Sequence, residues 1–156
     1  MKLRMLLAVA AIGVLFSVTG CTSTPDTGEW SVSVEVVGQG THEFTNKVAD
    51  EIGPVDIKAA MKDGDDIKDE DTWRGILVYD LVNYYGLDNF SVISIEGEDG
   101  KVAEISPDRL ETDRTGFAWA KNGKALDSDS GPVKFVNHNR GPKHWIDKVV
   151  KITIIE

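Results

Sequence analysis

Cysteine is almost absent from this chain of 156 residues, because Cys21 is the only one. A single thiol excludes an intramolecular disulfide framework and any zinc or iron–sulfur site built from several cysteines. Basic residues are also scarce, with 17 Lys and Arg against 26 Asp and Glu and a formal net charge of −9. Phosphate backbones are bound by basic surfaces, so this charge argues against nucleic acid as a partner.

A long hydrophobic run is missing as well. The apolar stretch at residues 5–16 is shorter than the roughly 20 residues of a membrane-spanning helix, and it follows Lys2 and Arg4, as in the core of a secretory signal peptide. Residues 18–20 (VTG) and Cys21 then resemble the lipobox of bacterial lipoproteins, in which the thiol is acylated and the chain is cut before it. The alternative is an ordinary signal peptide followed by a stray cysteine.

The lipobox predicts three parts for the chain. Residues 1–20 are a lipoprotein signal peptide, residues 21–29 are a lipidated Cys21 with a polar tether, and residues 30–156 are the folded domain. The protein is then extracytoplasmic and anchored to a bacterial-type membrane by lipid. Cleavage leaves 15 basic against 26 acidic side chains, so anionic headgroups do not attract the domain and the lipid must hold it.

The domain has the composition of a globular protein, with 41% hydrophobic and 28% charged residues. Alternating or continuous apolar residues, bounded by turns, predict strands. These strands are expected at residues 30–37, 55–61, 90–95, 101–105, 117–121, 133–137 and 149–155.

Helical spacing predicts a helix at residues 77–85, before Gly86, and a helix start at residues 106–110. Residues 41–52 are ambiguous, and a short helix before Gly53 fits the spacing of their apolar residues. Residues 63–71, which are mostly acidic, are expected to form an exposed turn or loop. The fold class is therefore α+β, a mostly β single domain with a few short helices.

Four segments in order resemble the molybdopterin-binding domain of sulfite-oxidase-type oxidoreductases. They span residues 73–82 (WRGILVYDLV), 98–108 (EDG followed by ISPD), 117–126 (FAWAKNGKAL) and 131–146 (GPVKFV followed by GPKHWI). The resemblance covers nearly the whole predicted domain and implies the fold of that family. It makes molybdopterin a possible cofactor.

The sequence departs from that family at the metal ligand. Catalytic members bind molybdenum through one cysteine thiolate in the segment before the W-x-G motif, whereas residues 59–71 here contain Met61 and many acids but no cysteine. Cys21 lies before the domain and cannot replace it. Carboxylates are hard oxygen ligands suited to other ions, so the sequence predicts the fold without ordinary molybdenum catalysis.

The candidate binding residues are His138, Arg140 and Lys143, in the loop 137–145 (NHNRGPKHW). In the family, the matching loop helps to hold the pterin and its phosphate, and Arg and Lys suit an anionic group. The alternative is a solvated loop with Trp145 in the core. A metal pair formed by His138 and His144 lacks a clear carboxylate third ligand.

Other features support weaker hypotheses. The acidic residues 63–71 invite a calcium site but fail the EF-hand template, because Ile67 and Lys68 occupy its fifth and sixth positions. The sequence contains no nucleophile elbow, Walker loop or dinucleotide fingerprint. Trp30 and Trp73 are expected in the core.

Three functions are compatible with these observations. The leading hypothesis is a lipid-anchored domain that binds a pterin-like or other small anionic ligand, or a partner protein, without classical molybdenum catalysis. The second is an oxidoreductase, or a subunit of one, that holds molybdopterin without thiolate ligation. The third is a purely structural surface lipoprotein.

Overall fold

The computed structural model describes residues 25–156, so the predicted signal peptide and the predicted lipidation site at Cys21 lie outside the described residues. The elements, in chain order, are β1 (Ser31–Val36), β2 (Gly40–Thr45), α1 (Asn46–Ile52), β3 (Val55–Ala59), β4 (Lys62–Asp63), β5 (Asp66–Ile67), β6 (Asp71–Leu77), α2 (Val78–Tyr84), β7 (Val92–Gly97), β8 (Val102–Ile105), the 3-10 turn η1 (Pro107–Arg109), β9 (Thr115–Lys121), β10 (Lys124–Ala125), β11 (Lys134–Asn137), the 3-10 turn η2 (Pro142–His144) and β12 (Val149–Ile155). Within this part of the chain, no helix has the length and apolar character needed to cross a membrane.

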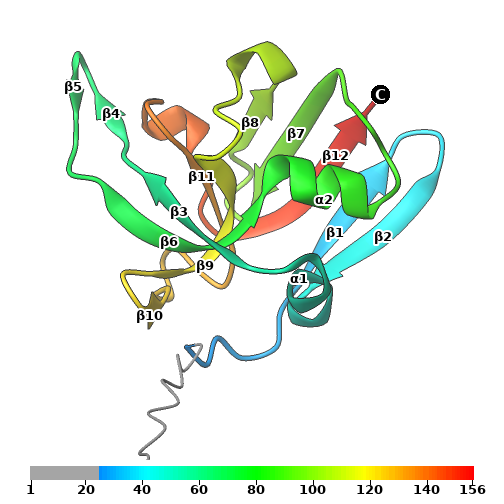
Figure 1. Cartoon of the computed structure of the whole chain (residues 1–156), viewed down its shortest axis with the longest axis horizontal. Coiled ribbons are helices and arrows are strands. Elements are labelled where there is room, and N and C mark those ends of the chain that lie inside the picture. The colour runs from blue at the N-terminus through cyan, green and yellow to red at the C-terminus, as the bar shows by residue number, and fades with distance from the viewer. Residues whose placement is uncertain (1–24) are drawn as a thin grey trace, which may run out of the picture.

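Two five-stranded sheets form the body of the domain (Figure 1). The first has the order β2-β1-β12-β7-β8, in which the first and last strands of the domain, β1 and β12, pair in parallel. The second has the order β10-β9-β6-β3, and β11 pairs with the first half of β9. The mostly β, α+β class predicted from the sequence is therefore confirmed.

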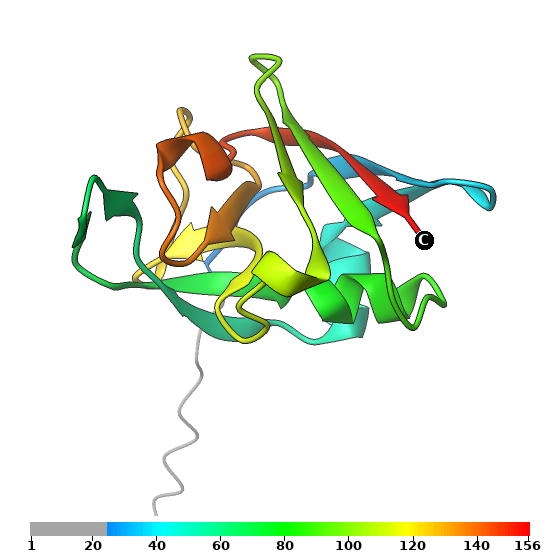
Figure 2. The ribbon, with the colours of Figure 1, turned by 90° about the horizontal axis from the view of Figure 1, so that it is seen from above.

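The main core lies between the sheets and under the two helices (Figure 2). Alternate residues of β1 are fully buried there, together with Phe44 of β2, Phe117 of β9 and Phe135 of β11. Trp30 belongs to this core and is 7% exposed, as predicted. A second, smaller apolar cluster forms around Trp73, near the start of β6. It contains Ile57, Ala59, Trp73, Ala118, Val136 and Trp145.

Two glycines allow β6 and β9 to approach closely. A Cβ on Gly75 would lie 2.1 Å from the carbonyl oxygen of Phe117, and one on Gly116 would lie 2.1 Å from that of Ile76. Both obstacles are backbone atoms, so neither position accepts a side chain without moving a strand. The pairing of the strands shifts register between Arg74 and Gly75. The glycine in the W-R-G segment is therefore a packing requirement of this crossing.

Three predicted elements differ from the structure. Residues 41–52 divide into β2 and then α1, because Thr45 caps the helix by accepting a hydrogen bond from the Val48 amide at 3.3 Å. The acidic segment 63–71 is not a simple loop, since β4 and β5 pair as a hairpin that projects from the body (Figure 1). The predicted helix at 106–110 is only the single turn η1.

The start of the described chain is held against the domain. The Asn46 side chain accepts a hydrogen bond from the Trp30 amide at 2.9 Å and donates one to the Gly28 carbonyl. The Gly28 amide also donates to the Asp26 carboxylate at 3.0 Å. The Gly28 end of the predicted tether is therefore hydrogen-bonded to the domain.

Candidate functional site

A cleft of about 440 Å³ opens at the start of β6, beside the smaller apolar cluster. This volume falls within the range of roughly 300–1,000 Å³ typical of small-molecule sites. Tryptophans, lysines and aspartates share its walls. The lining residues are Ala59, Met61, Lys68, Asp69, Asp71, Trp73, Lys121, Ala125, Leu126, Asp127, Ser130, Lys134 and Trp145.

Two tryptophans form the apolar part of the cleft. The rings of Trp73 and Trp145 meet edge to face, with centroids 5.6 Å apart. Each indole N–H is fixed by a backbone carbonyl: that of Trp73 donates to Ala59 at 3.2 Å, and that of Trp145 donates to Arg140 at 3.1 Å. Both rings are more than nine-tenths buried, so they are held rigidly and also contribute to the core.

Two lysines lie over these rings. The ammonium group of Lys121 is 5.0 Å from the Trp73 ring centroid, and that of Lys134 is 5.9 Å from the centroids of both Trp73 and Trp145. The Lys134 side chain is only 10% exposed and is paired with Asp147. A cation held over an aromatic face and paired with a carboxylate is fixed in position.

Lys121 is paired in the same way with Asp71, at 2.7 Å. Burial alone would raise the pKa of the Asp71 carboxyl. Hydrogen bonds from Lys121 and Asn122, with the positive charge of Lys121, outweigh burial and lower that pKa. The carboxylate is therefore kept ionised beside the ammonium group, and the cleft presents fixed charges of both signs.

The cleft also shows whether molybdenum fits. The segment before the W-R-G residues contributes Ala59, Met61, Lys68, Asp69 and Asp71 to the wall, so this part of the cleft offers a thioether and carboxylates but no thiolate. The carboxylates of Asp69, Asp71 and Asp127 are hard oxygen donors. Across residues 25–156, no three His, Cys, Asp or Glu side chains gather into a metal-binding group. The donor set does not fit a thiolate-ligated molybdenum centre.

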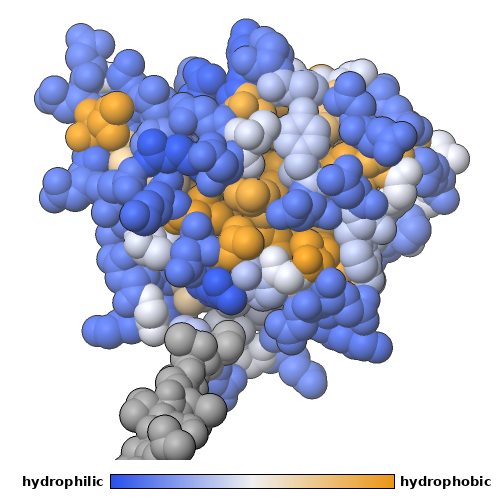
Figure 3. All heavy atoms as spheres, in the orientation of Figure 1, coloured by the Kyte–Doolittle hydropathy of each residue, from blue (hydrophilic) through white to orange (hydrophobic). Residues whose placement is uncertain are grey.

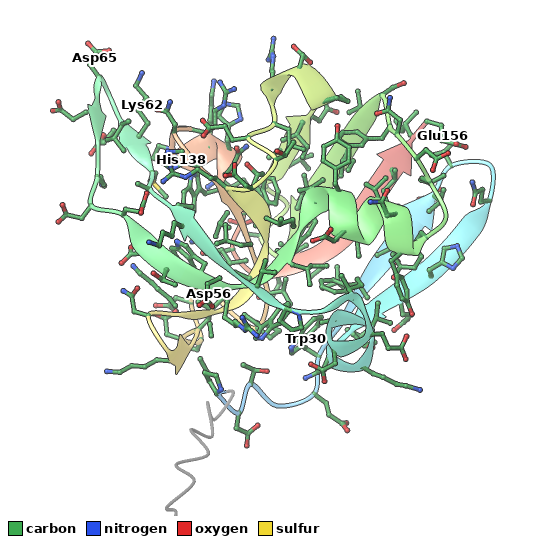
Figure 4. The ribbon with its side chains drawn as sticks, viewed as in Figure 1. Trp30, Asp56, Lys62, Asp65, His138 and Glu156 are labelled. Carbon is green, nitrogen blue, oxygen red and sulfur yellow. The ribbon has the colours of Figure 1, made fainter. Side chains whose placement is uncertain are left out.

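Of the three predicted binding residues, His138 is the most buried, at 7% exposure. Its Nδ1 accepts a hydrogen bond from the Ala60 amide at 3.0 Å, and its Nε2 lies 4.0 Å from a Glu111 carboxylate oxygen. Burial, and then the charge of Arg114, lower the pKa of the imidazole. His138 thus connects β11 to the end of β3, next to the hairpin (Figure 4).

Arg140 and Lys143 lie on the outer side of the same loop and do not line the cleft. The Arg140 carbonyl accepts hydrogen bonds from the Lys62 amide at 2.9 Å and from the Trp145 indole, so only its backbone faces that way. Its guanidinium donates instead to the Arg109 carbonyl at 3.1 Å. The side chains of Arg140, Lys143 and His144 lie near Arg109, outside the cleft.

The acidic segments serve structural roles. At the β4–β5 hairpin, Lys68 pairs with Asp63 at 3.3 Å, and Ile67 is exposed. Figure 3 shows a small hydrophobic area surrounded by hydrophilic atoms where the hairpin projects. In residues 127–130 (DSDS), the Asp127 carboxylate accepts hydrogen bonds from the Asp129 and Ser130 amides at 3.1 and 2.9 Å. That bonding is typical of a turn in which the carboxylate mimics a backbone carbonyl.

Sequence reasoning missed Lys121 and Lys134 as site residues and placed Trp73 only in the core. A signal for Lys134 was present, since it is a single charged residue within the otherwise uncharged segment GPVKFV. It is also the one charged residue of β11, whose four residues are all buried. No comparable signal marks Lys121, because it becomes part of the cleft only through the pairing of β9 with β6.

No protein-family model matches the chain, and no curated protein matches it in sequence. Among solved structures, it resembles the sulfane dehydrogenase SoxCD from Paracoccus pantotrophus, with a TM-score of 0.64 and 14% sequence identity. The match covers 81% of this chain but only 38% of the SoxCD chain. SoxCD is a sulfite-oxidase-type molybdenum enzyme, so the match supports a distant relationship of fold to the family that the four sequence segments resemble. At this identity the likeness shows the fold alone.

Proposed function

We propose that this protein is a lipid-anchored, extracytoplasmic binding domain that has the sulfite-oxidase-type fold without its molybdenum chemistry. Its cleft binds a small, planar, anionic ligand of the pterin-like class. The observation that carries the proposal is the cleft beside the end of β3, in which Lys121 and Lys134 lie over two buried tryptophans.

The chemistry of the cleft supports this ligand class. A planar aromatic ring gains contact with the Trp73 and Trp145 edges, and its negative charge is met by the two ammonium groups. Lys134 is largely withdrawn from water, so a charge-assisted hydrogen bond to it is weakly screened. Because the lining of the cleft contains no cysteine, the proposed ligand is organic and is not held through a cysteine-bound metal.

The anchor is supported by the order of the first residues. A short apolar run, the lipobox-like residues 18–20 and the single Cys21 together predict acylation of that thiol. Incorporation of radiolabelled palmitate into the full chain, with Cys21→Ser as the matched control, tests this part. Equal labelling of both chains contradicts it.

The first measurement is the metal and pterin content of the full chain. The protein is made in a molybdopterin-producing host and extracted in a non-ionic detergent. Molybdenum is measured by mass spectrometry and pterin by fluorescence after oxidation. We expect pterin without molybdenum.

Two other results discriminate the rival functions. Near-stoichiometric molybdenum supports the oxidoreductase that holds its cofactor without thiolate ligation, and it contradicts a cleft that binds its ligand without molybdenum. Neither molybdenum nor pterin in folded protein favours a purely structural lipoprotein.

Direct binding provides the sharper test of the cleft. Pterin carboxylate is titrated into the full chain while tryptophan fluorescence is recorded. We expect saturable quenching that weakens by about tenfold or more in Lys121→Met/Lys134→Met. Arg140→Gln/Lys143→Gln removes two positive charges outside the cleft and is the matched control. If the control weakens binding as much as the cleft variant, the ligand does not occupy the cleft.

A further inference from the structure

A second group of basic residues covers one surface of the domain. It consists of Lys101, Arg109, Arg140, Lys143 and His144, and is called the cation surface below. Two hydrogen bonds fix its backbone: the Arg140 guanidinium donates to the Arg109 carbonyl at 3.1 Å, and the Lys101 ammonium donates to the Pro142 carbonyl at 3.3 Å. They connect η2 to η1 and to the start of β8, so the charges belong to an ordered surface.

The charges of this surface are poorly compensated. Arg109 has a carboxylate within ion-pair distance, Asp108 at 3.9 Å, and both side chains are more than 70% exposed. Between residues 25 and 156, no carboxylate lies within 4.0 Å of the side-chain nitrogens of Lys101, Arg140 or Lys143. In a chain with 26 acidic residues, such a cluster of like charges is exceptional.

The positive charges of this surface also affect the pKa of His144. Burial lowers the pKa of its imidazole, and the charges of Lys143, Arg140 and Arg109 lower it further. Every charged group that shifts this pKa is positive. Mutual repulsion among cations does not stabilise the fold, so the arrangement suits an anionic partner.

The position of the surface indicates which kind of anion it meets. The loop of residues 140–144 and the turn after β8 lie at the top of the view in Figure 1, and the described chain begins at the bottom, on the side of Trp30 (Figures 1 and 4). If the lipid anchor proposed above holds residue 21, the cation surface faces away from the membrane. Lipid headgroups are then out of its reach.

We propose that the cation surface docks an acidic segment of a partner protein. Guanidinium groups bind carboxylates through paired hydrogen bonds, and the surface holds two of them, because the Arg140 guanidinium lies against the Arg109 backbone. The chain as a whole is net negative and repels such a partner elsewhere, so the charge directs an acidic segment to the cation surface. This proposal goes beyond ligand binding in the cleft, and it depends on the anchor only for the direction in which the surface faces.

The test uses the full chain in a non-ionic detergent and a fluorescein-labelled deca-glutamate peptide as the probe. Binding is followed by fluorescence anisotropy at low salt, about 50 mM, where such interactions are least screened. We expect Arg140→Gln/Lys143→Gln to weaken binding by about tenfold. The matched control, Lys47→Gln/Lys124→Gln, removes the same charge from two exposed lysines elsewhere and should change affinity by less than about twofold.

Three results overturn the proposal. Equal weakening in both double variants shows that only net charge matters. Absence of peptide binding by the unaltered protein removes the surface as an acidic-segment site. Binding of phosphatidylglycerol vesicles that depends on Arg140 and Lys143, without peptide binding, assigns the surface to lipid headgroups.

The two proposals fail separately. The pterin carboxylate titration depends on Lys121 and Lys134, and the peptide titration depends on Arg140 and Lys143. Circular dichroism of each double variant confirms that the fold is retained. Absence of peptide binding by the unaltered protein, with a normal pterin titration, contradicts the docking surface alone.

Discussion

Basic side chains occupy two opposite environments in this protein. In the cleft, Lys121 and Lys134 are paired with Asp71 and Asp147 and lie over tryptophan rings. On the cation surface, Arg140 and Lys143 have no carboxylate partner among the residues that the structure describes, and they lie near other cations. The cleft therefore holds its ammonium groups in fixed positions, whereas the cation surface leaves most of its positive charges without a carboxylate partner.

The largest expected effect comes from removing the ring on which the cleft is built. Trp73→Ala should lower the free energy of unfolding by about 3–5 kcal/mol, because Trp73 is 6% exposed and packs against Trp145. It should also abolish quenching by pterin carboxylate. Urea denaturation measures the first effect. A loss below about 1 kcal/mol would show that Trp73 is peripheral to the packing.

The next largest expected effect is the difference in stability cost between replacing a cleft lysine and replacing an arginine of the cation surface. Lys134→Met keeps the apolar stem but breaks the nearly buried pair with Asp147, and should cost about 1–2 kcal/mol of stability. Asp147 is 43% exposed and can be hydrated after the change, which limits the cost. Arg140→Met should change stability by less than about 0.5 kcal/mol. Equal costs in urea denaturation would remove the distinction between the regions.

Much of the fold could be predicted from the sequence because its signals are local. The alternation of Val32, Val34 and Val36 specifies a strand with one buried face, and Gly86 follows the predicted helix. The structure of residues 41–52 was harder to predict. Phe44 belongs to β2 and Val48 and Ile52 belong to α1, yet the three are spaced as if they lay on one face of a single helix. The β4–β5 hairpin was missed because exposed, highly charged strands lack an apolar pattern.

The candidate site was less predictable because it is made by non-local pairing. The sequence directed attention to a loop rich in basic residues, and Arg140 and Lys143 do lie together there on the surface. Lys121 approaches Trp73 only because β9 pairs with β6, where the two residues are register partners. Trp145 reaches the same place from a loop more than twenty residues later in the chain. A linear motif cannot encode such a convergence.

The cation surface predicts a pH dependence with a definite sign. The pKa of His144 is lowered by burial and then by Lys143, Arg140 and Arg109, so the unfolded chain takes up the proton more readily than the folded one. Its contribution to stability is present above the ordinary histidine pKa and is lost as pH falls through the lowered value. Arg140→Gln/Lys143→Gln should therefore raise the pKa of His144 in an NMR titration. An unchanged value would mean that burial alone sets it.

The smallest expected effect concerns Asp71, whose charged neighbour, Lys121, favours its ionised form, whereas the neighbours of His144 oppose its charged form. Hydrogen bonds from Lys121 and Asn122 lower its pKa against the opposing effect of burial, so its contribution to stability is present above about pH 4 and is lost as pH falls further. The pair with Lys121 is partly exposed, and Asp71→Asn should cost no more than about 1 kcal/mol at neutral pH. Thermal unfolding of this variant should show a weaker decline in acid than the unaltered protein. A parallel decline would show that the Lys121–Asp71 pair does not hold the Asp71 carboxylate ionised in the cleft.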